Sequence, residues 1–268
     1  MRVIGIMLVH NEDRFVETAL RNVMGFCDEL IAVDHGSDDL TPSILKLLSD
    51  EFAPKLRVVT TADSADSHRL IEMYAGTDTW VFAVDGDEIY DPVGLSRLRV
   101  RLDAGEFDPW WVVFGNVLNV KTLYKDRRTA SGHLAPPCRS MTKLYNFAAI
   151  YSWTGNCVER LHGGEIKFRE KFDTSLRCSL HEAVAWDDAD FRCLHLCFLK
   201  RSSKDAAGAG PRKNIMDLHA RSWGKIFRRV KERFFGVPSV DWKQEKYARG
   251  PIVKKDIGGF FPPLDSKP

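Results

Sequence analysis

The most concentrated group of chemically active side chains in the sequence is acidic and follows an apolar run. The segment 81–84 is apolar throughout, and Asp85, Gly86, Asp87 and Glu88 come directly after it. So short a run is typical of a strand that is buried on both faces. Burying neighbouring carboxylates without partners costs on the order of several kcal/mol, so we expect this strand to end at the edge of a sheet. Two aspartates around a glycine then offer hard oxygen ligands to a divalent cation.

The first hundred residues alternate between strand and helix patterns. Strands are expected at 3–9, 30–33, 56–60 and 80–85, with amphipathic helices between them. This alternation indicates an α/β fold, Rossmann-like, with a mostly parallel sheet and covering helices. Right-handed crossovers place the carboxyl ends of parallel strands on one rim. The polar residues expected at that rim are His10, Asn11, Glu12, Asp34, Asp85 and Asp87.

Composition and missing motifs exclude several classes of protein. The net charge of +2 is too small to steer the chain to nucleic acid. The segment HNEDRF after the first strand has no glycine, which excludes the usual dinucleotide fingerprint, and a P-loop is absent as well. The sequence contains no apolar run long enough to span a membrane and no signal-peptide cleavage site, so we expect a cytoplasmic protein.

The order of these segments resembles the nucleotide-binding half of family 2 glycosyltransferases, which have the GT-A fold. That family shows Asn-Glu after its first strand, then V-D-D-G-S-x-D-x-T, and then D-x-D. This chain has Asn11-Glu12, then VDHGSDDLT from Val33 to Thr41, and then DGD from Asp85. It departs from the pattern at His35, where a second Asp is usual, and at Leu40.

The resemblance implies transfer of a sugar from a nucleotide-diphosphate sugar, with a UDP-sugar favoured, to an acceptor hydroxyl. It implies a divalent cation, Mn²⁺ or Mg²⁺, that neutralises the leaving diphosphate, and an inverting reaction. It also implies a place in cell-surface polysaccharide or glycoconjugate synthesis. The residues expected to bind the nucleotide-sugar are His10, Asn11, Glu12, Asp34, Arg69 and Asp85. The expected metal ligands are Asp85, Asp87 and His195. A lone His between apolar neighbours is also typical of a core residue, so that alternative stays open for His195.

The second half of the chain resembles the acceptor half of lipopolysaccharide-core-type members of this family. There a short K/R-L-F/Y strand precedes a segment that ends in His-Glu and a later strand with a His; here these are Lys143-Leu144-Tyr145, His181-Glu182 and His195. Inverting transfer needs a base to take the proton of the acceptor hydroxyl. Glu182 is the first candidate for this base. Its rivals are Glu159 and Asp173, and a purely structural carboxylate is the alternative for Glu182.

We expect three regions along the chain. Residues 1–105 form the nucleotide-sugar-binding half, 106–204 the acceptor-binding half, with a loop at 121–140, and 205–268 a helical and irregular tail. Within the tail, 222–235 reads as a basic amphipathic helix with aromatic residues. It can pack on the domain, which we favour, or lie peripherally on the inner face of a membrane, which would suit a lipid-linked rather than a saccharide acceptor.

Two other functions fit parts of the pattern. A degenerate, non-catalytic member of the family would bind a nucleotide-sugar or a partner protein, although the intact DGDE and HE pairs argue against this. A sugar-phosphate nucleotidyltransferase shares a related sheet but usually carries a Gly-rich basic loop after its first strand. The segment HNEDRFVETAL is not such a loop.

Overall fold

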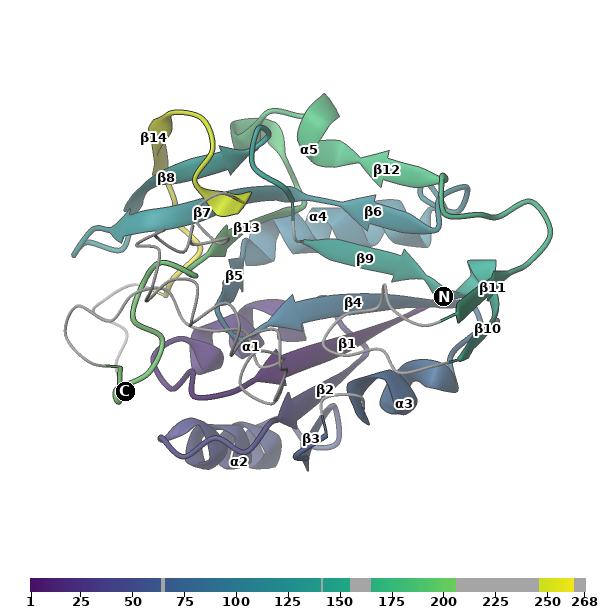
Figure 1. Ribbon diagram of the computed structural model, residues 1–268, viewed down its shortest axis with the longest axis horizontal. Helices are drawn as coiled ribbons and strands as arrows, with labels where there is room; N and C mark the ends of the chain where they lie inside the picture. Colours follow the sequence, from purple (N-terminus) through teal and green to yellow (C-terminus); the bar gives the residue numbers. More distant parts are fainter. Residues whose placement is uncertain (64–65, 141, 155–164, 206–245, 263–268) are drawn as a thin grey trace, which may run out of the picture.

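A seven-stranded sheet forms the centre of the protein. The computed structural model describes residues 1–63, 66–140, 142–154, 165–205 and 246–262 (Figure 1). In sheet order the strands are β12 (Arg177–Ser179), β6 (Val112–Phe114), β9 (Lys143–Asn146), β4 (Thr79–Asp85), β1 (Arg2–Val9), β2 (Glu29–Asp34) and β3 (Leu56–Thr60). All of them run in one direction except β9, which pairs antiparallel with both β4 and β6. The α/β fold with a mostly parallel sheet is therefore confirmed.

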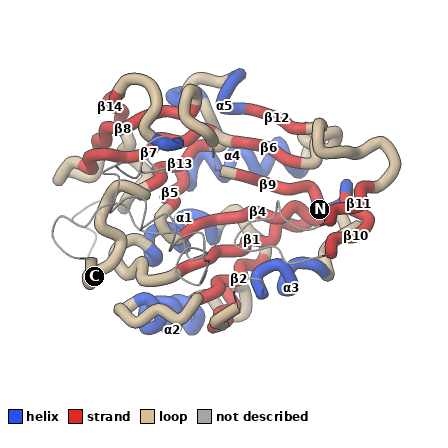
Figure 2. The backbone as a smooth tube through the Cα atoms, viewed as in Figure 1, coloured by secondary structure: helices blue, strands red, loops and turns tan. Residues whose placement is uncertain are grey.

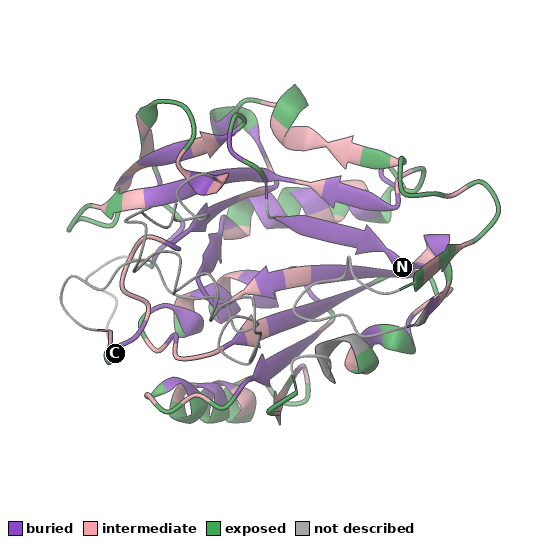
Figure 3. Ribbon diagram, in the orientation of Figure 1, coloured by how far each residue is buried: buried purple, intermediate pink, exposed green. Residues whose placement is uncertain are grey.

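Both faces of this sheet are buried, because alternate residues of each strand point to opposite sides. Val3 and Met7 of β1 join a core that also contains the apolar faces of three helices, α1 (Val16–Met24), α2 (Thr41–Glu51) and α4 (Pro92–Asp103). Ile4 and Ile6 join a second core that contains α3 (Asp66–Glu72) and residues of β9. Figure 3 shows β1 and β4 buried along most of their length. This two-sided burial explains why their sequences are continuous apolar runs.

A second, five-stranded sheet joins parts of the chain that are far apart in sequence. In sheet order its strands are β14 (Ile252–Asp256), β8 (Thr129–Ala135), β7 (Asn116–Leu123), β13 (Arg192–His195) and β5 (Glu88–Tyr90). β5 and β7 each begin two or three residues after a strand of the central sheet ends. The two sheets therefore meet directly after Asp85 and at Gly115. A separate two-stranded ribbon pairs β10 (Ile150–Thr154) with β11 (Glu165–Phe168).

The loop expected at 121–140 is wrong, because most of this segment belongs to the hairpin of β7 and β8. The strand β8 buries small residues such as Ala130 and Gly132 rather than large apolar ones. A Cβ on Gly132 would collide with the backbone of Asn119 on β7, so the two strands approach closely at this point. Small buried residues among basic ones give a composition like that of a loop, and the pattern of alternation is lost.

Much of the described part of the expected tail is packed and extended, with Lys246 and Tyr247 helical and Ile252–Asp256 forming a strand. Strand β14 pairs antiparallel with β8, and Phe260 and Phe261 are buried. The Phe260 ring stacks on Trp186 at a centroid distance of 5.9 Å, and its carbonyl accepts a hydrogen bond from Asn22 on α1. The expected amphipathic helix at 222–235 lies outside the described residues.

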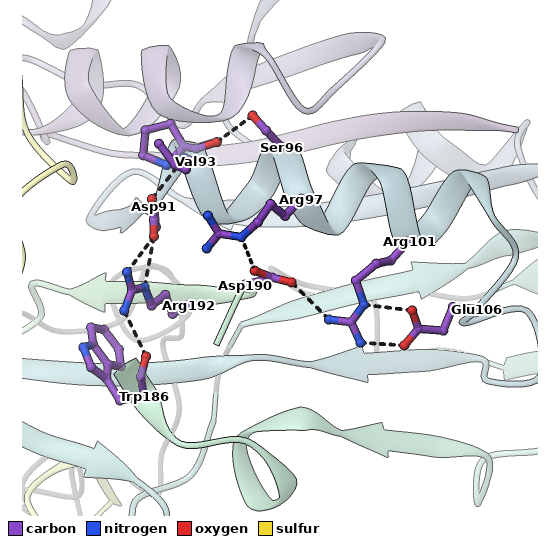
Figure 4. Close-up of polar contacts among 10 residues, drawn as sticks. Asp91, Val93, Ser96, Arg97, Arg101, Glu106, Trp186, Asp190 and Arg192 are labelled. Carbon is purple, nitrogen blue, oxygen red and sulfur yellow. Dashed lines mark hydrogen bonds and ion pairs between the residues drawn. The ribbon is translucent and has the colours of Figure 1, made fainter. Parts of the chain in front are cut away.

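A polar network ties α4 to the second sheet (Figure 4). Asp91 caps α4 by accepting a hydrogen bond from the backbone N–H of Val93, and it also accepts two hydrogen bonds from Arg192 on β13. Asp190 accepts hydrogen bonds from two further arginines of the helix, Arg97 and Arg101. The network fixes β13, the strand that carries His195. No helix in the described ranges is long and apolar enough to cross a membrane.

Candidate functional site at the rim of the central sheet

The carboxyl ends of the central strands bring the predicted donor-site residues together. β1 lies between β2 and β4, with Val9 paired to Asp34 and Leu8 paired to Asp85. Because β12 and β6 run parallel to β4, the residues after β12 lie on the same rim (Figure 2). The rim therefore carries both the donor-site aspartates and the His181-Glu182 pair.

The loops after β1 and β2 are locked to each other through Asn11. Its backbone has a φ of +54°, and its side-chain oxygen accepts hydrogen bonds from the backbone N–H groups of Asp38 and Asp39. Its own N–H donates to Ser37 Oγ, which in turn donates to Asp34 at 2.5 Å. His10 Nδ1 lies 2.9 Å from the carbonyl of His35. Asn11 therefore holds the two loops together. As a result, Asp34 and His10 lie beside each other.

Asp87 and Glu12 lie at the centre of the site and share one arginine. Both carboxylates are buried, and Arg201 Nη1 lies 2.6 Å from Asp87 Oδ2 and 3.1 Å from Glu12 Oε1. Burial alone lowers the pKa of Arg201, but attraction to Asp87 and Glu12 outweighs it and raises the pKa further above its ordinary high value. A Cβ on Gly86 would collide with the Glu12 carboxylate, so this glycine allows a close approach rather than a left-handed turn.

His195 reaches the same centre from the second sheet. It is paired with Glu88 on β5 and with Asn119 on β7, so the three residues lie side by side on adjacent strands. Its Nδ1 lies 2.8 Å from Asn119 Oδ1, and its Nε2 lies 4.0 Å from Asp87 Oδ2. The ring also packs edge-on against Tyr247. The structure thus places His195 in the core and beside Asp87 at the same time, and its ring nitrogen faces the acidic centre.

Glu88 supports the site from within. Its carboxylate is buried and accepts hydrogen bonds from the backbone N–H of Asp85 at 3.2 Å and from the Tyr90 hydroxyl at 2.9 Å. Burial and the nearby Glu88 charge raise the pKa of Tyr90, so its hydroxyl keeps its proton as a donor. Asp85, half-buried at the end of β4, is thereby held at the rim.

The side chains at this centre are of the types that bind divalent cations, but they are not arranged as a metal site. Asp85, Asp87 and His195 would supply two carboxylates and an imidazole, which suit Mn²⁺. Among the described residues, however, no three His, Cys, Asp or Glu side chains are grouped closely enough to hold a metal ion. The cation that lies against Asp87 is the guanidinium of Arg201. The arrangement of these side chains therefore does not fit the predicted metal site, which stays a prediction.

Arg69 is exposed on α3, with its Nη1 3.7 Å from the carboxylate of Asp63, which is also exposed. A pair of this kind is screened by water and contributes little to stability. Arg69 is therefore not held in one place by that pair.

The predicted catalytic base lies at the far end of the rim. Glu182 and His181 are on the short helix α5 (Leu180–Ala183), directly after β12, with 3.8 Å between His181 Nε2 and Glu182 Oε1. The Glu182 side chain is 67% exposed, whereas that of His181 is 10% exposed. Burial lowers the pKa of His181, so its ring is neutral near pH 7. Three strand spacings, about 14 Å in all, separate β12, which leads into α5, from β4, which ends at Asp85.

The two rival bases differ in position. Asp173 precedes β12, at the opposite end of that strand from the rim, and its carboxylate accepts hydrogen bonds from the N–H and hydroxyl of Ser175. These bonds lower the pKa of Asp173, and they are typical of a turn. Glu159 lies outside the described residues.

Sequence reasoning missed two residues of the site, Asn119 and Tyr247. Asn119 contacts His195 from β7, a strand whose pairing is set by the tertiary fold, and neither Asn119 nor Tyr247 belongs to a recognisable motif. The double ion pair of Arg201 was missed for the same reason, since Arg201 is 114 residues away from Asp87 in the sequence.

Comparisons with known proteins give distant likenesses. No protein-family model matches the chain. A TPR repeat-containing protein of Synechococcus elongatus, Synpcc7942_0270, is 33% identical over 100 residues, which is 37% of this chain and 24% of that protein. The match thus spans about a quarter of that relative.

Two solved structures are similar to part of this chain. One is TarS 1–349 of S. aureus in complex with UDP, at 18% identity and a TM-score of 0.39, covering 56% of this chain and 48% of that chain. The other is glucosyl-3-phosphoglycerate synthase from Mycobacterium tuberculosis in complex with phosphoglyceric acid, at 18% identity and a TM-score of 0.37, covering 56% and 58%. Likenesses of this size do not decide between functions, which must be argued from the site itself.

Proposed function

We propose that the chain is a glycosyltransferase of the GT-A type that moves a sugar from a nucleotide-diphosphate sugar to an acceptor hydroxyl. The observation that carries the proposal is the meeting of Asp34, Asp85 and Asp87 at one rim, from strands β2 and β4 on either side of β1. Open α/β sheets bind ligands at the carboxyl ends of their strands. The order of the motifs along the chain resembles that of family 2 glycosyltransferases, and the topology supports that resemblance.

The donor end of the rim would bind the nucleotide. Asp34 keeps an acceptor carboxylate at the end of β2 while Ser37 fixes its orientation, which suits hydrogen bonds from a base N–H or ribose hydroxyls. His10 lies in the adjacent loop, where an imidazole packs well against a base. The donor is expected to be a UDP-sugar, and Arg69, exposed on α3, is a further candidate to pair with its diphosphate.

The acceptor end would carry the base. Glu182 is exposed, so a sugar acceptor or a lipid-linked one can reach it. The neutral, mostly buried His181 beside it would help to position the acceptor hydroxyl. Attack from this side, opposite the leaving diphosphate, would give inversion at C1.

A divalent cation, Mn²⁺ or Mg²⁺, remains part of the sequence-based prediction, with Asp85, Asp87 and His195 as its ligands. It would supply charge neutralisation for the leaving diphosphate. Arg201 and such an ion need the same oxygen of Asp87, so only one of them can hold it at a time.

Calorimetric titration with UDP, GDP, CDP and dTDP tests the proposal, each with Mn²⁺ and again with EDTA. We expect one of the four to bind and the corresponding nucleotide-sugar to release its nucleotide when acceptors are supplied. Binding without any sugar release or transfer would instead support the non-catalytic alternative. Failure of all four to bind would exclude the donor site.

A further inference from the structure

The segment 196–205, here called the strap, follows β13 and is fastened across the rim. It begins with a hydrogen bond from the backbone N–H of Leu196 to the carbonyl of Asp87 at 2.9 Å. Further along, Ser202 Oγ donates to Asp39 at 2.6 Å and the N–H of Ser203 donates to Asp13 at 2.7 Å. Lys204 Nζ lies 2.9 Å from the carboxylate of Asp38. The strap is therefore tied to the loops that follow both β1 and β2.

These fastenings fix the backbone of Arg201 in particular. Its N–H donates to Asp205 Oδ2 at 2.9 Å, and its carbonyl accepts from the N–H of Arg14 at 3.1 Å. The side chain is 12% exposed and reaches from the strap to the buried carboxylates of Asp87 and Glu12. Both ends of Arg201 are thus held, which is unusual for so long and flexible a side chain.

The two carboxylates contact only one nitrogen of the guanidinium. Both contacts go to Nη1, and the opposite edge, Nε and Nη2, makes no hydrogen bond to any residue within the described ranges. The Arg201 side chain is 12% exposed, so part of it is reached by solvent. Nε and Nη2 therefore offer N–H donors that the two carboxylates do not use, on a permanently charged group.

The same chain shows what such an edge binds. Arg192 uses Nε and Nη2 to hold one oxygen of Asp91 at 3.0 and 2.9 Å, and Arg101 uses the same two atoms to hold both oxygens of Glu106 at 2.8 and 2.5 Å (Figure 4). In each case the ligand is an oxyanion. Phosphate oxygens match this edge as well as carboxylate oxygens do.

We infer that Arg201 is the cation of the donor site, holding Asp87 and Glu12 with Nη1 and one phosphate of the donor diphosphate with Nε and Nη2. The inference rests on the proposed function and replaces the expected metal ion at Asp87 with a residue of the chain. Asp87 and Glu12 then act as positioning residues, which set the angle of the guanidinium and keep it at the rim. The site binds a nucleoside diphosphate without any divalent ion.

Calorimetry of the full chain tests this inference by comparing the wild type with Arg201→Lys. This substitution keeps the positive charge and the ion pairs but removes the two donors, Nε and Nη2. UDP, GDP, CDP, dTDP and inorganic pyrophosphate are titrated into the wild type and the variant, in EDTA and in Mn²⁺. We expect one nucleotide to bind the wild type equally well in both media and about tenfold or more weakly to the variant. Arg101→Lys, the same substitution at an arginine with the same edge and no part in the site, is the matched control and should bind as the wild type does.

A spectroscopic titration gives a second result that does not depend on nucleotide. Arg201→Ala removes the guanidinium that holds Asp87 and Glu12 and leaves these two buried carboxylates uncompensated. This variant should therefore bind Mn²⁺, which is measured as a loss of the free-ion signal in electron paramagnetic resonance. The wild type and Arg201→Lys should leave that signal unchanged. Mn²⁺ uptake by the wild type to the same extent would overturn the inference.

The remaining outcomes separate the inference from the function. A nucleotide that binds the wild type only with Mn²⁺, or binds Arg201→Lys as tightly as the wild type, overturns the role of Arg201 and leaves the glycosyltransferase proposal standing. Failure of every nucleotide in both media overturns both.

Discussion

A double-mutant cycle on Asp87 and Arg201 measures how strongly the acidic centre depends on its arginine. The two side chains are 2% and 12% exposed, and their closest atoms are 2.6 Å apart. Removing one partner of a buried ion pair costs about 3–5 kcal/mol, because a charge is left buried and uncompensated. Arg201→Ala does this to two carboxylates at once, whereas Asp87→Ala leaves Arg201 paired with Glu12 at 3.1 Å.

The cycle should therefore be asymmetric. We expect Arg201→Ala to lower the free energy of unfolding by about 3–5 kcal/mol, and Asp87→Ala by about 1–3 kcal/mol. In the double variant only Glu12 is left without its arginine, so the combined loss should fall short of the sum by about 2 kcal/mol.

Urea unfolding followed by tryptophan fluorescence is a suitable assay, since the chain has seven tryptophans. Arg97→Ala is the control: its partner is Asp190, its own side chain is 55% exposed, and its loss should cost about 0–1 kcal/mol. Losses at Asp87 and Arg201 that add to within about 0.5 kcal/mol would refute the coupling. So would an Asp87→Ala variant that is less stable than Arg201→Ala.

Three further predictions follow from the rim and the strap. Glu182→Gln should leave nucleotide affinity unchanged and lower the rate of sugar transfer about a hundredfold or more; an unaltered rate would move the base elsewhere. Burial alone raises the pKa of Asp39, but hydrogen bonds from Ser202 and Thr41 outweigh burial and lower the pKa below its ordinary value. The ionised Asp39 therefore stabilises the folded protein above about pH 4, and this contribution is lost as the pH falls through the lowered pKa. Between pH 5 and pH 3 the wild type should therefore lose more unfolding free energy than Asp39→Asn, and equal losses would contradict the assignment. Vesicles with anionic lipid test the segment 222–235: packing on the domain predicts no co-sedimentation, and salt-sensitive co-sedimentation that is lost when its basic residues are replaced would instead indicate peripheral membrane contact.

Much of the central sheet could be predicted from the sequence, because its strands are buried on both faces. Such strands are short apolar runs that end abruptly in polar residues, as at Val84 and Asp85, and the helices between them carry a regular apolar face. Once the strands are parallel, the rim follows from topology, and with it the meeting of Asp34 and Asp85.

The second sheet could not be predicted in the same way. β8 buries small residues, so it has no apolar run, and β14 pairs with it from more than a hundred residues away. The partners of the acidic centre depend on this sheet, since Asn119 lies on β7 and the strap follows β13. Local patterns therefore identified the carboxylates but not the ion pairs that Arg201 makes with them.

The role of Asn11 shows a related limit. The sequence places it at the rim with the right neighbours for binding a ligand, whereas its side chain is used to hold the backbone of the loop after β2. A polar residue after a strand can bind a ligand or build the loop, and the choice depends on which N–H groups the fold brings within reach.

Hydrogen exchange with and without a saturating UDP-sugar tests most directly whether the rim is the donor site. If the proposal holds, peptides that cover 8–14, 34–40 and 85–88 will exchange more slowly when the nucleotide-sugar is present. Peptides in α4, the helix that the polar network ties to the second sheet, will exchange at the same rate with and without it. Protection that falls elsewhere, or on none of the three rim segments, would contradict the account.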